Sequence, residues 1–261
     1  MTILKHELKQ NGVSLGVWTA AIGFLFAICI FIFPELKGQM DGVSDMFASM
    51  GSFTEAFGLD KVSFGSLLGF YSVELGNILG IGGALFAALC AVTALAKEEK
   101  EHTAEFLLTH PISRTRVITE KLISVMLQII ILNIAVYCIA IAAITAIGED
   151  VPRKELTLLH LAFLLLQIEF AGICFGISAF LRRSGMSIGL GVAVTMYFLN
   201  IIANITDKVS FLRYITPFAY AEGTEIVSEG RLDWGLVLLG MLYCAVGIAA
   251  AYIKYSKKDI V

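Results

Sequence analysis

Three side chains within apolar stretches of this chain could take part in transport or catalysis: Glu74, Glu169 and Ser187. A carboxyl group in hydrocarbon is costly, so both glutamates are expected to face other helices or a water-filled path. Each could line a substrate path or gate, or could hold helices together by hydrogen bonds. Packing is the favoured interpretation for Glu74, which lies nearer the end of its stretch. With their neighbours Gln167 and Asn77, the two glutamates form the candidate substrate path.

The sequence predicts no catalytic residue and no metal site. Ser187 lies in a G-x-S-x-G pattern, which requires a turn from a strand into a helix, whereas here it opens an apolar helix. The nearest candidate base, His160, lies at the other end of the preceding apolar stretch. The metalloprotease pattern H-E-x-x-H and the phosphate-binding pattern G-x-x-x-x-G-K-[ST] are both absent, so the chain itself is not expected to hydrolyse ATP. The five cysteines lie in five different apolar stretches and are expected to be small buried hydrophobes.

A polar segment, residues 97–114, joins two long apolar stretches and must form a compact element on one membrane face. It reads as a short amphipathic helix over about 103–111. Thr103 can cap its start, and Glu105 lies in the first turn, where the helix dipole favours a carboxylate. Pro111 ends it. Such a helix could dock a soluble partner, and the alternative is a solvated loop. Its apolar surface would consist of Phe106, Leu107 and Leu108.

This segment resembles the permease subunits of type 2 ATP-binding cassette exporters. That family carries an acidic cluster, then Gly-Thr-hydrophobic-Glu, a leucine pair and Pro-hydrophobic-Ser-Arg after the second span. The chain departs from the pattern at His102, where the family usually has glycine. The residues that match are Glu98, Glu99, Glu101, Thr103, Glu105, Leu107, Leu108, Pro111, Ser113 and Arg114.

The resemblance implies a coupling helix over about residues 103–111, which seats in a groove of a separate cytoplasmic ATPase subunit. That subunit would bind ATP and Mg, and this chain would bind no cofactor. The resemblance also implies a homodimer through spans one and five, and glycine pairs at the starts of these spans fit close helix approach. The coupling residues would be Glu101, Thr103, Glu105, Phe106, Leu107, Leu108, Pro111, Ser113 and Arg114.

The composition excludes a soluble globular protein. The chain is 57% hydrophobic and 16% charged, whereas soluble domains carry about a quarter charged residues. Runs of about 20 apolar residues can cross the hydrocarbon core of a bilayer. The sequence therefore predicts a single all-α membrane domain with six transmembrane helices. The expected spans are residues 12–33 (closed by Pro34), 70–96, 122–147, 156–181, 186–205 and 236–253.

The basic residues predict the orientation. With six spans, both termini, residues 97–121 and the turn at 182–183 share one side of the membrane. That side holds 12 of the 19 lysines and arginines, so it is expected to be cytoplasmic. The chain is then a multi-pass protein of the cell membrane with both termini inside the cell. Basic residues flank spans and form no patch interleaved with aromatics, so nucleic acid is not an expected partner.

Three segments outside the spans are expected to form helices of their own. Residues 1–11 place apolar side chains on one face, as an interfacial helix does, and the resemblance implies the family's elbow helix. Residues 35–69 carry aromatics and methionines at helical spacing on the outside. Residues 206–234 contain Pro217, and the resemblance implies two short re-entrant helices there before span six.

The function expected from these features is that of a permease subunit in an ATP-driven exporter. Its mostly apolar and aromatic spans suit an amphipathic or hydrophobic substrate such as a peptide, drug or lipid. Two alternatives remain: an intramembrane enzyme that depends on Glu74, Glu169 or Ser187, and a stand-alone secondary transporter. The latter predicts inverted repeats with broken spans, which the sequence does not display. Substrate identity, transport direction and the choice between homodimer and heterodimer stay open.

Overall fold

A computed structural model describes most of the chain. The described residues form helices and turns, with no strand among them. The predicted coupling helix lies outside the described residues, as does most of the predicted external segment 35–69. The described residues are 2–37, 51, 54, 62–63, 65–97, 113–181 and 185–257.

Six helical stretches in the described part of the chain are long and apolar enough to cross a membrane, as the sequence predicts. The second consists of three consecutive helices, because a π-helical turn interrupts it. The stretches are α1 (Thr2–Lys37), α4–η1–α5 (Leu67–Leu75, Gly76–Ile81 and Gly82–Ala94), α8 (Arg114–Ala146), α9 (Arg153–Ser178), α10 (Met186–Ile205) and α12 (Trp234–Ser256). The fold class predicted from the sequence is confirmed.

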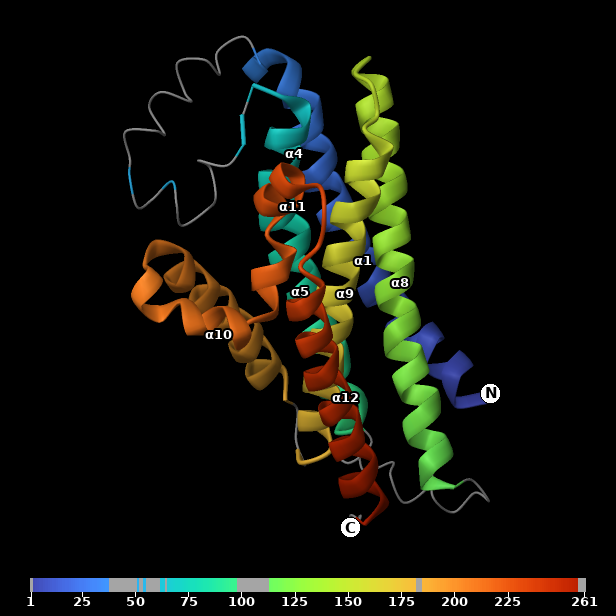
Figure 1. Cartoon of the computed structure of the whole chain (residues 1–261). Helices are drawn as coiled ribbons and strands as arrows, with labels where there is room; N and C mark the ends of the chain where they lie inside the picture. Colours follow the sequence, from blue (N-terminus) through green and yellow to red (C-terminus); the bar gives the residue numbers. More distant parts are fainter. Residues whose placement is uncertain are drawn as a thin grey trace.

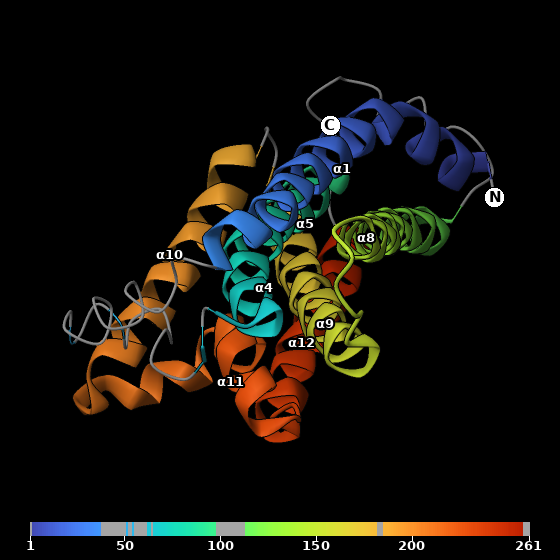
Figure 2. The ribbon, with the colours of Figure 1, turned by 90° about the horizontal axis from the view of Figure 1, so that it is seen from above.

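Helix α9 lies at the centre of the bundle, against α5, α8 and α12 (Figure 1). Helices α1 and α8 pack together on one side, while α10 lies tilted on the opposite flank, where it contacts α5 (Figure 2). The core between these helices contains large buried rings such as Phe86, Phe163 and Phe175. One broad face of α10 stays exposed within the subunit, including Val194 and Phe198.

The first helix differs from the prediction at both ends. The expected elbow, residues 1–11, is the N-terminal end of α1 and not a separate helix, and no proline stands between it and span one. Figure 2 shows this end turning away from the rest of α1 and running beside the start of α8. Pro34 does not close the span, which continues to Lys37. A proline this close to a helix end removes a hydrogen bond in the last turns only.

Helices α9 and α12 meet backbone to backbone. A Cβ atom added at Gly176 would lie 2.6 Å from the carbonyl oxygen of Gly247. One added at Gly247 would lie 2.5 Å from the carbonyl oxygen of Gly172. The spacing of Gly172 and Gly176 predicts such close approach, and their partner in the structure is α12.

Three short helices precede α12, in the region where the sequence predicts re-entrant helices. They are η2 (Asp207–Tyr214), η3 (Pro217–Ala221) and α11 (Gly223–Glu229). Thr216 caps η3, and Pro217 occupies its first turn, where a missing backbone N–H costs nothing. All five residues of η3 are buried. This element is therefore packed inside the protein, between α9, α10 and α12.

Candidate functional site: a cytoplasmic junction and an outer polar pocket

Two of the nine predicted coupling residues lie within the described part of the chain, at the start of α8. Ser113 and Arg114 are described, and the other members of the set lie outside the described residues. Ser113 is the N-cap of α8, and its hydroxyl accepts a hydrogen bond from the backbone N–H of Arg116 (3.3 Å). The segment 98–112 therefore leads directly into a capped helix start. The members outside are Glu101, Thr103, Glu105, Phe106, Leu107, Leu108 and Pro111.

Arg114 joins the start of α8 to the end of α12. Its Nη1 lies 3.4 Å from the carbonyl oxygens of both Tyr255 and Ser256, in the last turn of α12. A guanidinium there complements the negative end of the helix dipole. One and a half turns later, the hydroxyls of Thr119 and Tyr252 lie 2.7 Å apart. Two adjacent turns of α8 are thus fastened to α12.

A buried ion pair joins the same part of α8 to the N-terminal end of α1. The Nζ of Lys121 lies 2.7 Å from Oε1 of Glu7, and the two side chains are 0% and 7% exposed. The neighbouring carboxylate of Glu120 accepts from the backbone N–H of Leu4 (3.1 Å) and from Nε of Arg116 (2.9 Å). The two contacts between α8 and α1 bring together residues more than 110 positions apart, and no sequence pattern signals them.

We call this set of contacts among α1, α8 and α12 the cytoplasmic junction, after the side of the membrane on which the sequence predicts it to lie. Any displacement of the segment 98–112 enters the membrane domain at Ser113. Because Arg114, Glu120 and Lys121 bind α12 and α1, the displacement would act on three helices together. The junction thus joins the first turns of α8 to both α1 and α12.

The four candidate substrate-path residues lie in four different environments. Glu169 is buried in α9 and accepts a hydrogen bond from the hydroxyl of Tyr220 in η3 (2.9 Å). Its carboxylate also fills the space beside Gly240 of α12, where any added Cβ would collide with it. The carboxylate therefore fixes η3 against α9 and α12.

Tyr220→Phe is expected to loosen this attachment. The change leaves Glu169 buried without its donor, at a cost of about 1–3 kcal/mol for an unsatisfied buried polar group. The matched control is Tyr243→Phe, which removes a hydroxyl that donates to the carbonyl oxygen of Tyr214 in a more exposed setting (3.1 Å). Thermal unfolding in one detergent would measure both. Equal losses in the two variants would contradict a special role for the Tyr220–Glu169 contact.

Gln167 and Glu74 contact neighbouring helices. The Oε1 of Gln167 accepts from Nδ2 of Asn133 in α8 (2.8 Å), and its side chain lies over Gly83 of α5. Glu74 is partly buried, and its Oε2 lies 3.7 Å from the Sγ of Cys29 in α1. Both side chains therefore link helices within the bundle.

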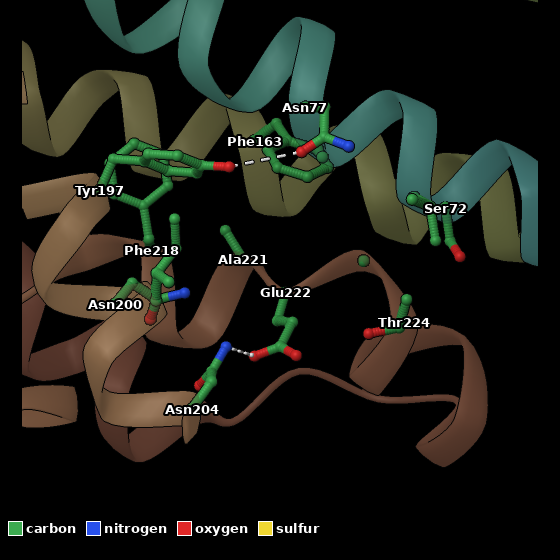
Figure 3. Close-up of a pocket in the computed structure, with 14 residues that line it drawn as sticks. Ser72, Asn77, Phe163, Tyr197, Asn200, Asn204, Phe218, Ala221, Glu222 and Thr224 are labelled. Carbon is green, nitrogen blue, oxygen red and sulfur yellow. Dashed lines mark hydrogen bonds between the residues drawn. The ribbon is translucent and has the colours of Figure 1, made fainter. Parts of the chain in front are cut away.

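Asn77, the fourth candidate, lines a polar pocket near the end of α10 that is predicted to face outward (Figure 3). The cavity measures about 60 Å³. We call it the outer pocket. Its wall comes from α4, η1, α9, α10, η3 and α11. The fourteen lining residues include Ser72, Asn77, Phe163, Tyr197, Asn200, Asn204, Phe218, Glu222 and Thr224.

Two hydrogen bonds cross this wall. The hydroxyl of Tyr197 lies 3.4 Å from Oδ1 of Asn77, and Nδ2 of Asn204 lies 3.1 Å from Oε2 of Glu222 (Figure 3). Tyr197, Asn200 and Asn204 share one face of α10, as their spacing of three and four residues requires. That spacing is visible in the sequence and indicates a polar face on this helix. Attention to carboxylates within the spans does not reveal it. Glu222 was missed because it follows the apolar segment of η3.

The π-helical turn η1 forms one side of the outer pocket. It contributes Gly76 and Asn77 to the lining, and the ring of Phe163 lies 3.1 Å from where a Cβ at Gly80 would stand. Such widened turns inside α-helices are often found at functional sites. A glycine at position 80 lets α9 approach the widened turn closely.

Comparison with known families shows to which family the chain belongs. A model of the ABC-2 family of transporter proteins matches residues 1–260. The chain belongs to the ABC-2 transporter family. No individual curated protein matches it. The family identifies a multi-pass membrane permease subunit of an ATP-binding cassette transporter, a type of subunit that is generally non-catalytic and partners with an ATPase.

The geometry of this ABC-2 permease does not favour a serine nucleophile. Ser187 is exposed on the first turn of α10. The candidate base His160 is buried in α9, where its Nε2 lies 2.7 Å from the hydroxyl of Tyr71. Tyr137 also packs edge-on against the His160 ring, with centroids 4.9 Å apart. The imidazole is therefore held in a packed contact between helices.

The glycine pairs expected at a dimer interface of the ABC-2 permease differ in their surroundings. Gly12 and Gly16 are exposed on α1, and nothing lies within 4 Å of a Cβ added at either position. Gly185 and Gly189 instead pack against Val92 of α5 in the same chain. These two glycines therefore already serve a contact within the subunit, and only the α1 pair is open to a second copy.

Proposed function

We propose that this ABC-2 permease is the transmembrane subunit of an ATP-driven exporter of an amphipathic or hydrophobic substrate, such as a peptide, drug or lipid. The cytoplasmic junction is the observation that carries the proposal. A helix over residues 103–111 would dock on a separate ATPase subunit, which holds ATP and Mg. Two copies of the permease, meeting through α1 and α10, would enclose the pathway, with both termini in the cytoplasm.

The work of the permease in this scheme is conformational. ATP binding draws the ATPase subunits together, and the docked helix moves with them. Because residues 98–112 lead into Ser113, the motion reaches α8 and, through Arg114 and Lys121, the ends of α12 and α1. The energy for the change comes from different contacts with the two states of the ATPase. Asn77 in the outer pocket would lie along the route of the substrate.

Co-purification with the product of a neighbouring ATPase gene tests the docking step. We expect the wild type to retain the ATPase and Glu105→Arg combined with Leu107→Asp to lose it, because a reversed charge and a carboxylate would enter the docking surface. Glu229→Arg is the matched control, since it reverses a charge on an exposed residue of α11, on the opposite side of the predicted topology. Retention of the ATPase by the double variant, with an unchanged elution volume, would remove the docking site from residues 103–111.

A further inference from the structure

The outer pocket contains buried hydrogen-bonding atoms without partners. Asn200 and Thr224 are 8% and 2% exposed, so each side chain is more than nine-tenths buried. Neither Oδ1 of Asn200 nor Oγ1 of Thr224 has a hydrogen-bond partner among the described residues. Both residues line the cavity, from α10 and α11 respectively (Figure 3). Buried polar atoms in native proteins are nearly always satisfied, so these two indicate that something occupies the space between them.

The lining is rich in acceptors and carries negative charge. Besides Oδ1 of Asn200, it presents the carboxylate of Glu222 and Oδ1 of Asn77. None of the fourteen lining residues is a lysine, arginine or histidine. A group that donates hydrogen bonds and carries positive charge fits this chemistry. A primary ammonium does so, because it offers three donors and no acceptor.

The size of the outer pocket and its aromatic lining residues further limit the ligands that fit. A cavity of about 60 Å³ is several times the roughly 10–15 Å³ that one water requires on this measure. It therefore holds a small head group and not a whole drug-sized molecule. The rings of Tyr197 and Phe218 meet edge to face, with centroids 5.4 Å apart, and Phe163 of α9 also lines the cavity. Aromatic rings stabilise a desolvated cation and also receive the first carbons of an attached chain.

We propose that the outer pocket binds the primary ammonium group of an amphiphile, whose apolar chain extends out of the pocket. The inference deepens the proposed export function, because it names a chemical class for the molecule that passes this site. Binding itself requires no ATPase. An amine-bearing substrate and an aminophospholipid head group share this chemistry.

Thermal unfolding of the purified permease in phosphatidylcholine nanodiscs tests the proposal. The probes are hexylammonium, hexyltrimethylammonium and hexanol, which share one tail and differ in donors and charge. At about ten times its Kd, hexylammonium is expected to raise the Tm of the wild type by about 3 °C. The trimethylated probe lacks N–H donors and hexanol lacks charge, so neither should match this rise.

Two variants assign the effect to the pocket. Glu222→Gln is expected to abolish the rise, while the matched control Glu225→Gln, one turn along α11 and paired with Arg213 outside the pocket, should retain it. Asn200→Asp adds a second carboxylate to the lining and should enlarge the rise, which keeps the test decisive if Glu222→Gln fails to fold. Replacing part of the phosphatidylcholine by phosphatidylethanolamine distinguishes the sources, since a lipid ligand would already occupy the site and remove the response.

The proposal is overturned if the three probes give equal shifts in phosphatidylcholine, which would indicate detergent-like binding, or if no probe shifts the Tm, which would leave only water in the pocket. Equal responses of Glu222→Gln and Glu225→Gln would also overturn it. Failure of the ATPase to co-purify would leave these results intact, so the two proposals fail separately.

Discussion

Lys121→Met is expected to be among the most destabilising substitutions at the cytoplasmic junction. It leaves the carboxylate of Glu7 buried without its cation, 7% exposed beside a methionine. Breaking one side of a buried ion pair costs about 3–5 kcal/mol. The expected consequence is a Tm lowered by about 10 °C, as the size scaling of unfolding implies. The N-terminal end of α1 should then separate from α8, which limited proteolysis of the variant in nanodiscs would detect.

The double variant Glu7→Leu with Lys121→Met separates the cost of an unpaired buried carboxylate from the cost of losing the ion pair itself. It removes both charges, and replacing a buried ion pair by apolar side chains often leaves the free energy of unfolding unchanged. We expect it to recover most of the lost Tm. Arg116→Met is the control, because its guanidinium side chain is 57% exposed, and it should change the Tm little. A double variant as unstable as Lys121→Met would show that the loss comes from removing the ion pair or its packing, and not from leaving the carboxylate of Glu7 without a cation.

Gly247→Val is expected to have the second large effect. Already at the Cβ position, the side chain would lie 2.5 Å from the carbonyl oxygen of Gly172 and 3.0 Å from the Cα of Ile173. Both atoms belong to the backbone of α9, which cannot rotate away as a side chain can. Added methylenes in a packed interior cost about 1–3 kcal/mol, and we expect this change to reach at least the upper end of that range. Tm and the recovery of monodisperse protein on size-exclusion chromatography measure it.

The matched control is Gly191→Ala in α10. Nothing lies within 4 Å of a Cβ at this exposed position, so the added methyl meets open space. Alanine also has the higher helix propensity, by about 1 kcal/mol. We expect an unchanged or slightly raised Tm. If Gly247→Val behaved like this control, the close backbone contact between α9 and α12 would be wrong.

The spans could be predicted from the sequence because a bilayer demands long apolar runs whatever their neighbours are. The fifth helix begins at Met186 and ends at Ile205, as predicted. The partner of each span could not be predicted in this way, since apolar residues surround every helix. The glycines at 172 and 176 predict close approach, but only the fold assigns them to α12. Residues 2–11 are helical but continue into the first span, and their amphipathic pattern could not predict this continuity, because it does not indicate where a helix begins or ends.

The candidate site was predictable only in part. The polar segment 97–114 stands out because charge interrupts an apolar chain. The contacts of Lys121 with Glu7 and of Tyr220 with Glu169 join residues far apart in the chain, and each residue looks ordinary in its own surroundings. The outer pocket depends on six elements that meet only in the folded chain. Of its polar residues, Asn77 alone entered the predicted substrate path.

The π-helical turn η1 has a consequence for the length of the second span. Because its hydrogen bonds run to the fifth residue and not the fourth, the turn holds one residue more than an α-helical turn. One residue rotates a helix by about 100°. Losing a single residue between 76 and 81 would let the span become a regular α-helix, but it would turn α4 away from α1 and α11, or α5 away from α9 and α10. The extra residue thus sets the rotation of α4, beside the outer pocket, relative to α5 in the other half of the span.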